Sequence, residues 1–350
     1  MSTVGQDLLD TAPALAFLTF GVPYAALLDR LGTFDAAVVR LADRRPHVRT
    51  ATLWAVAAAV TALLNLDTTI VLLTPIAVRL ARRSDHDPVV VAAVPLLLSG
   101  LASSFLPVSN LTTLIAQGRT DLSTLDVLTR LGPASAVAVV VGWFAFRTRA
   151  PHVLTLDARP GDADDGTALR VGGIVVAVTV VGFVLGPLVG VAPWMVLLVL
   201  DVALVVRLRW VPWREIPLLT AAGVGALVAL VAAIGAGPAT WMTGDGIGPT
   251  AASAVVAAAL ANVLNNLPAT IVGLGSVGTM TDGSWGWLWG VNAGSLLLPW
   301  GTLATILWWR VLRSEGVSID LRRYSATIVP VALVAFVAGT AALLLTTAVA

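Results

Sequence analysis

The feature that most constrains this chain is a series of ten apolar runs joined by short polar connections. The runs cover residues 11–28, 51–78, 89–118, 131–146, 171–189, 193–206, 215–236, 251–275, 285–309 and 325–349. Only 12% of the 350 residues are charged, about half the charged fraction of an ordinary soluble domain. Because about 20 mostly apolar residues form a helix that crosses a bilayer, the runs exclude a water-soluble fold.

The runs predict helices rather than barrel strands. They are continuous and rich in Ala, Leu and Val, whereas a membrane β-barrel would show short alternating segments. A helix also satisfies its own backbone hydrogen bonds in lipid. The predicted fold class is therefore an all-α polytopic membrane protein with roughly nine or ten membrane elements.

The polar composition excludes several kinds of chemistry. Cys is absent, which excludes disulfides, iron–sulfur clusters, thiolate metal sites and cysteine nucleophiles. The three histidines, His47, His86 and His152, fall in polar connections. We therefore expect no metal site within the membrane, no cofactor and no enzymatic activity.

The lack of Lys bears on energy coupling and on partners. A nucleotide-binding loop of the Gly-Lys-Ser or Gly-Lys-Thr kind requires Lys, so ATP does not drive this chain by itself. A separate partner ATPase would leave no motif in this chain, so the sequence does not exclude one. Basic patches beyond those that membrane topology demands are absent, so we expect no nucleic acid.

The arginines predict the topology. Nineteen of the 21 Arg residues lie in the connections that follow the first, second, fourth, sixth and ninth runs. By the positive-inside rule these connections are cytoplasmic, which predicts a multi-pass protein of the cytoplasmic membrane. No basic residue precedes Arg30, so we expect the first run to be retained rather than cleaved as a signal peptide.

The second run has arginines at both ends, so both ends should be cytoplasmic. Residues 51–64 and 67–80 are each about 14 residues long, which gives ~21 Å of helix, too short to cross ~30 Å of hydrocarbon. This pattern predicts a re-entrant hairpin with its tip at residues 65–69.

The second half repeats the pattern in the opposite direction. No Arg lies between Arg214 and Arg310, so residues 251–275 predict a hairpin that enters from outside, with its tip at 265–270. Aligned from Asn65 and Asn266, residues 65–71 and 266–272 share five of seven identities.

These patterns together predict an inverted repeat, the architecture of secondary transporters. The first repeat is 1–146, with a span, a surface helix, a hairpin, a broken span and a span. A cytoplasmic linker follows at 147–170, and the second repeat is 171–350, with scaffold spans before its hairpin, broken span and final span.

The hairpin tips and two proline breaks mark the expected site. Pro107 and Pro299 each interrupt a span, and non-helical backbone at membrane depth requires protein or a water-filled cavity around it. We expect the two tips and two breaks to meet near the midplane. The candidate substrate-binding residues are Asn65, Thr68, Thr69, Ser109, Asn110, Asn265, Asn266, Thr270 and Asn292.

Asp67 is the candidate proton-coupling residue. It is the only carboxylate that these predictions place deep in a membrane element close to a break, and an ionisable residue there is a functional candidate by default. The alternative is that Asp67 caps the second hairpin helix. The Asn, Ser and Thr candidates could likewise be caps or satisfy freed backbone groups.

Three further segments have simpler interpretations. Asp201 lies six residues before Arg207, and snorkelling or an ion pair would explain it. Residues 33–49 predict an amphipathic helix on the cytoplasmic surface, and residues 155–168 predict a flexible loop. Several Trp residues, Trp285, Trp287 and Trp308 among them, lie near predicted helix ends, as in an interfacial belt.

The chain resembles the ion-transporter superfamily that includes arsenite/antimonite efflux permeases and divalent anion:sodium symporters, and it is most similar to the arsenite permeases. The resemblance lies in residues 65–75, 107–111, 262–269 and 298–305. It implies a moving substrate domain built from two hairpins and two unwound helices, a separate scaffold often used for dimerisation, and elevator-type alternating access. The resemblance therefore allows a homodimer.

The chain departs from that family at three points, one in its N-terminal spans and two in the expected site. Only one span precedes the first hairpin, Asn65 and Asp67 are separated by Leu66 where the family has adjacent Asn and Asp, and Asn292 stands where an Asp is typical. The departures leave Asp67 as the main candidate for proton coupling.

The first functional hypothesis is proton-coupled efflux of arsenite or antimonite. Arsenite is mostly neutral As(OH)₃ at neutral pH, so Asn and Thr side chains could bind its hydroxyls without a thiolate. The alternatives are sodium-coupled transport of organic or inorganic anions such as citrate, dicarboxylate or sulfate, and a degenerate membrane scaffold that transports nothing. For a transporter, the partners are a small solute, a coupling ion and the lipid bilayer.

Overall fold

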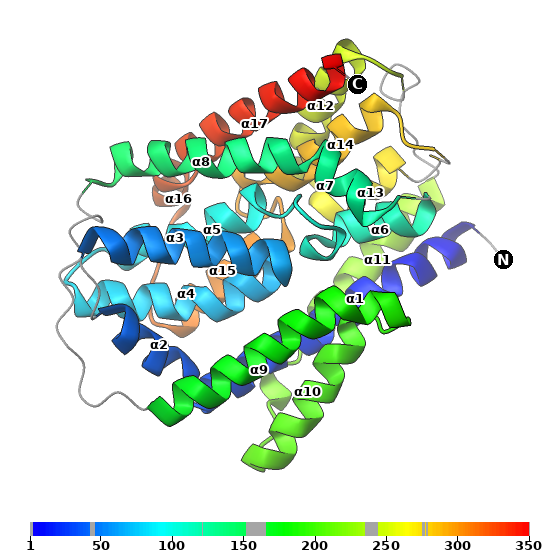
Figure 1. Ribbon diagram of the computed structural model, residues 1–350. Coiled ribbons are helices and arrows are strands. Elements are labelled where there is room, and N and C mark those ends of the chain that lie inside the picture. The colour runs from blue at the N-terminus through cyan, green and yellow to red at the C-terminus, as the bar shows by residue number, and fades with distance from the viewer. Residues whose placement is uncertain are drawn as a thin grey trace.

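The computed structural model describes residues 3–42, 46–120, 122–151, 166–234, 244–274, 277 and 279–349. The regular structure of these residues is entirely helical, as predicted (Figure 1). The N-terminal half contains α1 (Thr3–Arg30), α2 (Thr33–Ala42), α3 (Pro46–Leu63), α4 (Leu66–Arg83), α5 (Pro88–Leu101), η1 (Pro107–Ser109), α6 (Leu111–Arg119), α7 (Thr124–Arg130) and α8 (Gly132–Arg149).

The C-terminal half contains α9 (Gly166–Leu185), η3 (Gly186–Val189), α10 (Pro193–Leu208), η4 (Trp213–Glu215), α11 (Leu218–Ile234), α12 (Ile247–Leu264), α13 (Asn266–Leu274), α14 (Asp282–Ala293), η6 (Gly294–Leu297), α15 (Leu303–Ser314), α16 (Leu321–Thr327) and α17 (Val329–Val349). Both halves contain a helical hairpin, a helix, a 3₁₀ turn, a further helix and a final pair of helices in the same order. The predicted opposite orientation of these halves in the membrane stays a prediction.

The helices form two groups (Figure 1). Helices α1, α9, α10 and α11 gather on one side, with α1 packed against α10 and α11. The two hairpins, the 3₁₀ turns η1 and η6 and the final helices of each half form the other group, in which α8 lies beside α17. Helix α1 also contacts α4 and α6, so it is the main contact between the groups.

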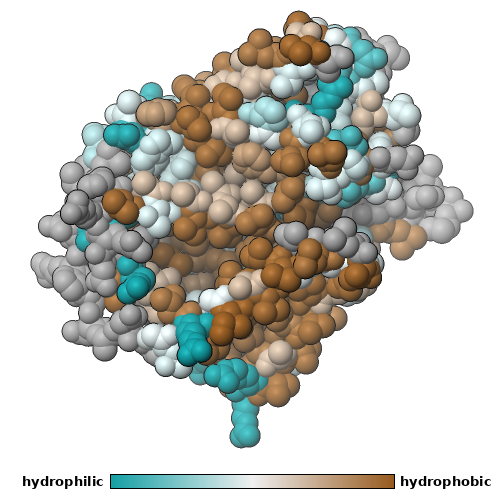
Figure 2. Space-filling view, in the orientation of Figure 1, coloured by the Kyte–Doolittle hydropathy of each residue, from teal (hydrophilic) through white to brown (hydrophobic). Residues whose placement is uncertain are grey.

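Apolar side chains cover much of the outer surface, as a lipid environment requires. They extend over both helix groups on the face that Figure 2 shows, and Phe144, Val178, Val199 and Val337 are among the exposed ones. The surface and the apolar helices identify a multi-pass membrane protein.

Fewer helices than expected are full-length spans. Within the described residues, α9, α12 and α17 are long and apolar enough to cross a membrane alone, and α7 with α8 could form a fourth span with a bend of 47°. Helices α3 and α5 are apolar but shorter over the segments that qualify. The ten apolar runs therefore do not each form a crossing helix.

The hairpins differ in detail from the prediction. The arms α3 and α4 have 18 residues each, about 27 Å at 1.5 Å per residue, because the helices continue into the Arg-rich flanks. The predicted tips are short turns, since α4 already begins at Leu66 and α13 at Asn266. Helix α12 is itself long enough to span, unlike a short hairpin arm.

The predicted surface helix 33–49 is wrong as a single element. Helix α2 ends at Ala42 and α3 begins at Pro46, a residue type that favours the first turn of a new helix. Phe34 and Val39 of α2 are buried, and the helix packs against α4 and α9. The predicted loop 155–168 lies mostly outside the described residues, and its last three residues belong to α9.

The predicted tryptophan belt is wrong for three residues, which lie inside the molecule. Trp285, Trp287 and Trp308 are buried. The indole of Trp287 donates to the Ala269 carbonyl at 3.0 Å, and that of Trp308 donates to the Ala92 carbonyl at 2.7 Å. Neighbouring helices therefore satisfy these polar edges that the prediction assigned to the interface.

Small residues bring α12 and α14 into close contact. A Cβ atom on Gly290 would lie 2.3 Å from the Ala254 carbonyl oxygen, and one on Gly286 would lie 2.2 Å from the Thr250 carbonyl oxygen. Small residues permit such backbone approaches in membrane proteins, where packing drives helix association. The second hairpin is thus held directly against the helix that leads to the second break.

Gly290→Ala should lower the melting temperature of the purified protein in detergent. The added methyl group would overlap the Ala254 carbonyl, and overpacking of this kind costs about 1–3 kcal/mol. Gly223→Ala in α11 is the matched control, because a Cβ there meets nothing within 4 Å, and Ala favours the helix by ~1 kcal/mol. Equal melting temperatures for the two variants would contradict the close contact.

Candidate functional site

The first hairpin tip is fixed to the first break by Asn65. Its Oδ1 accepts from the Asp67 backbone N–H at 2.8 Å, which caps α4, and its Nδ2 donates to the Val108 carbonyl at 3.3 Å. Val108 directly follows Pro107, where the helix is interrupted. One buried amide thus satisfies a helix start and a freed carbonyl together.

The second tip uses the same pair of hydrogen bonds. Asn265 accepts from the Leu267 N–H at 3.3 Å and donates to the Trp300 carbonyl at 2.9 Å, and Trp300 follows Pro299. The predicted pairing of Asn65 with Asn266 is therefore wrong by one residue in hydrogen-bonding terms. Asn265 has a φ of 88°, a region in which Asn is enriched among non-glycine residues.

Asn292 joins the two halves at the centre. Its Nδ2 donates to Ser104 Oγ at 2.9 Å and to Thr113 Oγ1 at 3.2 Å, and its Oδ1 accepts from the Thr112 hydroxyl. All four side chains are buried. Asn292 of α14 therefore holds both ends of the first break through a satisfied polar network.

Several other predicted site residues also bond within the protein. Thr69 and Thr270 donate to carbonyls one turn earlier, at 3.0 and 2.7 Å. Ser109 donates to the Ser103 carbonyl at 3.2 Å, and Asn110 caps α6 through the Thr112 N–H at 3.1 Å. These bonds match the capping interpretation, and a substrate-binding role for these residues stays a prediction.

Three predicted residues keep buried polar atoms without a hydrogen-bond partner among the described residues: Asp67 Oδ1, Thr68 Oγ1 and Asn266 Oδ1. The interpretation of Asp67 as the helix cap is wrong, because Asn65 occupies that position and Asp67 lies in the first turn of α4. Asp67 is 5% exposed, and no ion pair joins it to another described residue.

The Asp67 side chain faces the other helix group. With Thr68 and Val71 it lines a narrow pocket closed by Phe17, Gly21 and Val22 of α1. This pocket is too small to admit water. Asp67 is therefore enclosed by apolar residues of α1 in this conformation.

A larger cavity continues the same seam between α1 and α4. It has a volume of about 680 Å³ and shares Val22 and Val71 with the Asp67 pocket. Asp67, Val71, Pro75 and Arg79 follow one another at intervals of four residues, so each lies beside the next along α4. The cavity lies towards the end of the molecule that the arginines predict to be cytoplasmic.

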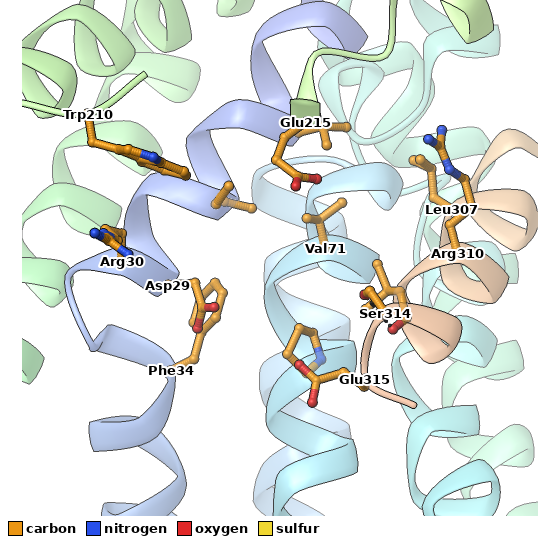
Figure 3. A pocket seen from close by; sticks show the side chains of 15 residues that line it. Asp29, Arg30, Phe34, Val71, Trp210, Glu215, Leu307, Arg310, Ser314 and Glu315 are labelled. Atoms are coloured by element: carbon orange, nitrogen blue, oxygen red, sulfur yellow. Dashed lines mark hydrogen bonds between the residues drawn. The ribbon is translucent and has the colours of Figure 1, made fainter. Parts of the chain in front are cut away.

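Charged residues surround this cavity (Figure 3). Arg30 and Arg310 lie on opposite sides, with Glu215 between them, and the Arg30 guanidinium stacks on Trp210 at 5.4 Å from the ring centroid. We call this cavity the vestibule; it is lined by charged residues and lies next to the Asp67 pocket, between α1 and α4.

An ion-pair network includes two residues of the cavity lining, Asp29 and Glu315. Arg79 of α4 pairs with Asp29 of α1 at 3.0 Å and with Glu315 at 3.1 Å, and Arg82 lies 3.8 Å from Glu315. The network joins the two helix groups.

Sequence reasoning missed three contributors to the site. The Arg79 network and the vestibule depend on α1, whose contacts are long-range and leave no local pattern. Asn262 was also missed, although its side chain holds the second break by donating to the Gly294 carbonyl at 2.7 Å and accepting from the Leu298 N–H at 2.8 Å. The spacing from Asp67 to Arg79 was the available signal.

The two tips make no direct hydrogen bond to each other within the described residues. Each tip bonds to the break of its own half, and α13 packs against α6, which follows the first break. The tips and breaks were predicted to meet. Each tip contacts the break of its own half, and Asn292 of the second half bonds to the first break.

A protein-family model described as "CitMHS: Citrate transporter" matches residues 10–293 of the chain. The matched range contains both hairpins, the first break and Asn292. No curated protein matches the chain.

Asn292→Leu should destabilise the protein more than Asn292→Asp. Leu leaves the hydroxyls of Ser104, Thr112 and Thr113 without their shared partner, and each buried unsatisfied group costs about 1–3 kcal/mol. With Asp, all three hydroxyls can rotate and donate to the carboxylate. Thermal unfolding in detergent measures the difference, and equal losses for Leu and Asp would contradict the network.

Proposed function

The chain belongs to the CitMHS citrate transporter family, and on that premise we propose that it moves a small organic anion such as citrate across the cytoplasmic membrane in exchange with, or together with, protons bound at Asp67. The family is one of secondary transporters of anions. The observation that carries the proton-coupling proposal is the buried, unpartnered Asp67 carboxyl at the head of a seam that leads to an open cavity.

The surroundings of Asp67 favour the neutral acid. An isolated carboxylate among apolar residues is costly to bury, and Phe17, Gly21 and Val22 supply no charge. A proton on Asp67 removes that cost. Transfer of Asp67 to water in another conformation would let the proton leave, which is the requirement for coupling.

The arrangement of the helix groups supports alternating access of the elevator type. Helix α4 carries Asp67 along α1, and α15 packs against α4 on the far side of the cavity. A displacement of the hairpin group along α1 would carry the tips away from the vestibule. The inverted repeat proposed for residues 1–146 and 171–350 would supply the matching outward-facing arrangement.

The vestibule suits the approach of an anion from the cytoplasmic side. Arg30 and Arg310 lie on its lining with Glu215, while Arg79 and Arg82 together offset the negative charges of Asp29 and Glu315. The starts of α4 and α13, which do not line this cavity, carry the partial positive charge of helix N-termini at the two tips. Sodium coupling at the same carboxyl is the alternative to a proton.

Arsenite is the second candidate substrate. The described tips and breaks present amides and hydroxyls and no cationic side chain, which suits neutral As(OH)₃ better than a dianion. Proton-coupled efflux of arsenite or antimonite would use the same Asp67 site.

Asp67→Asn should abolish proton-driven accumulation of labelled citrate in proteoliposomes, because the amide cannot release a proton. Exchange of citrate across the membrane at equal pH should persist, since no net proton movement is needed. Asp320→Asn is the control, because Asp320 is an exposed helix cap and Asn also caps helices. Accumulation driven by sodium but not by protons in the wild type would contradict the proton proposal.

The substrate is tested separately in an arsenite-sensitive host. For a citrate carrier, expression of the wild-type chain should leave arsenite sensitivity unchanged, whereas vesicles take up labelled citrate. Protection that depends on Asp67, with no citrate uptake, would favour the arsenite candidate. Assembly in the membrane with neither activity would favour a non-transporting scaffold.

A further inference from the structure

Asp201 is a second buried carboxyl, far along the chain from the tips. It lies in the middle of α10 on the same face as Leu197 and Leu204. Asp201 is 8% exposed, and its Oδ1 is buried with no hydrogen-bond partner. Because burial of an unpartnered carboxyl is costly, its presence here needs a functional explanation.

The two sequence-based interpretations of Asp201 are wrong. Six residues separate it from Arg207, which places the two about 120° apart around the helix, on different faces. Arg207 is exposed, and no ion pair joins Asp201 to another described residue. Asp201 therefore neither snorkels nor pairs with Arg207, and its charge would be uncompensated.

A buried pair of hydroxyls lies near Asp201 on the two helices that pack against α10. Tyr24 Oη of α1 lies 2.6 Å from Thr179 Oγ1 of α9, and Thr179 donates its own proton to the Val175 carbonyl at 2.9 Å. Since a threonine hydroxyl has one proton, Tyr24 must be the donor to Thr179. The Tyr24 oxygen is then left as an acceptor, within electrostatic range of Asp201.

The charged groups around this contact are few. Tyr24 is the titratable residue of α1 that faces Asp201, and the described part of α9 has only Arg170, which is exposed near its start. The turn η3 between α9 and α10 has no titratable residue. A proton on the carboxyl is therefore the available way to neutralise it.

We propose that Asp201 is a second proton-binding site, formed with Tyr24 and Thr179 where α1, α9 and α10 meet, and that it holds a proton in this conformation. The Tyr24 hydroxyl lies within electrostatic range of the acid without a hydrogen bond to it, and its own proton goes to Thr179, which in turn donates to the Val175 carbonyl. Loss of the proton would leave a charge among Leu197 and Leu204 and loosen α10 from α1.

The position of α1 gives this site its importance. Gly21 of α1 lines the Asp67 pocket and also approaches Leu197 of α10, whose Cδ1 would lie 3.8 Å from an added Cβ. Helix α1 thus lies between two buried carboxyls, one in each helix group. Protonation of Asp201 would therefore influence how α1 packs against α10, and α1 also forms the wall of the Asp67 pocket.

Infrared spectroscopy of the full chain in lipid nanodiscs tests the site without any transport assay. At neutral pH, the wild-type protein should show the C=O stretch of protonated carboxylic acids, and ¹³C labelling of the Asp carboxyls should shift it. Asp201→Asn should remove one component of that band. Asp320→Asn, which changes an exposed carboxyl, should leave the band unchanged.

Two further variants keep the test decisive if Asp201→Asn folds poorly. Asp201→Glu should retain the component at a displaced frequency, and Tyr24→Phe should shift it because the hydroxyl dipole within electrostatic range of the acid is gone. An unchanged protonated-acid band in Asp201→Asn, or no response to Tyr24→Phe, would overturn the proposal. Because the readout is a vibrational band, the result does not depend on which solute is transported.

Discussion

The need to satisfy backbone groups away from water governs this molecule. Each interruption of a helix frees carbonyl and N–H groups that lipid cannot bond, and asparagine amides meet the demand at both hairpin tips. Asn65 and Asn265 each cap a helix and hold a carbonyl just beyond a proline. The interruptions are therefore fixed structural points, and the candidate site is built around them.

The general fold could be predicted from the sequence because it depends on local signals. The apolar runs predicted the helices, and Pro107 and Pro299 predicted the two interruptions. Register could not be predicted in the same way, since the identity match favoured Asn266, whereas the backbone at Asn265, with φ of 88°, makes that residue the counterpart of Asn65. Trp287 was misplaced for a related reason, because its partner, the Ala269 carbonyl, is brought near only by packing.

The candidate site was predictable only in part. A carboxylate next to a tip identified Asp67, and the structure places it in an enclosed pocket with an unpartnered oxygen. The wall of that pocket is α1, whose sequence shows no feature that pairs it with α4. Most polar tip residues are satisfied within the protein, so residue type alone could not separate them from Asp67, Thr68 and Asn266.

Arg79 joins parts of the molecule that an elevator cycle would separate. It pairs with Asp29 of α1 and with Glu315 beyond α15. If α4 and α15 travel together, the Glu315 pair moves with them, whereas the Asp29 pair must come apart. In such a cycle the Asp29 pair would resist the displacement only weakly, because cellular salt partly screens ion pairs that solvent can reach.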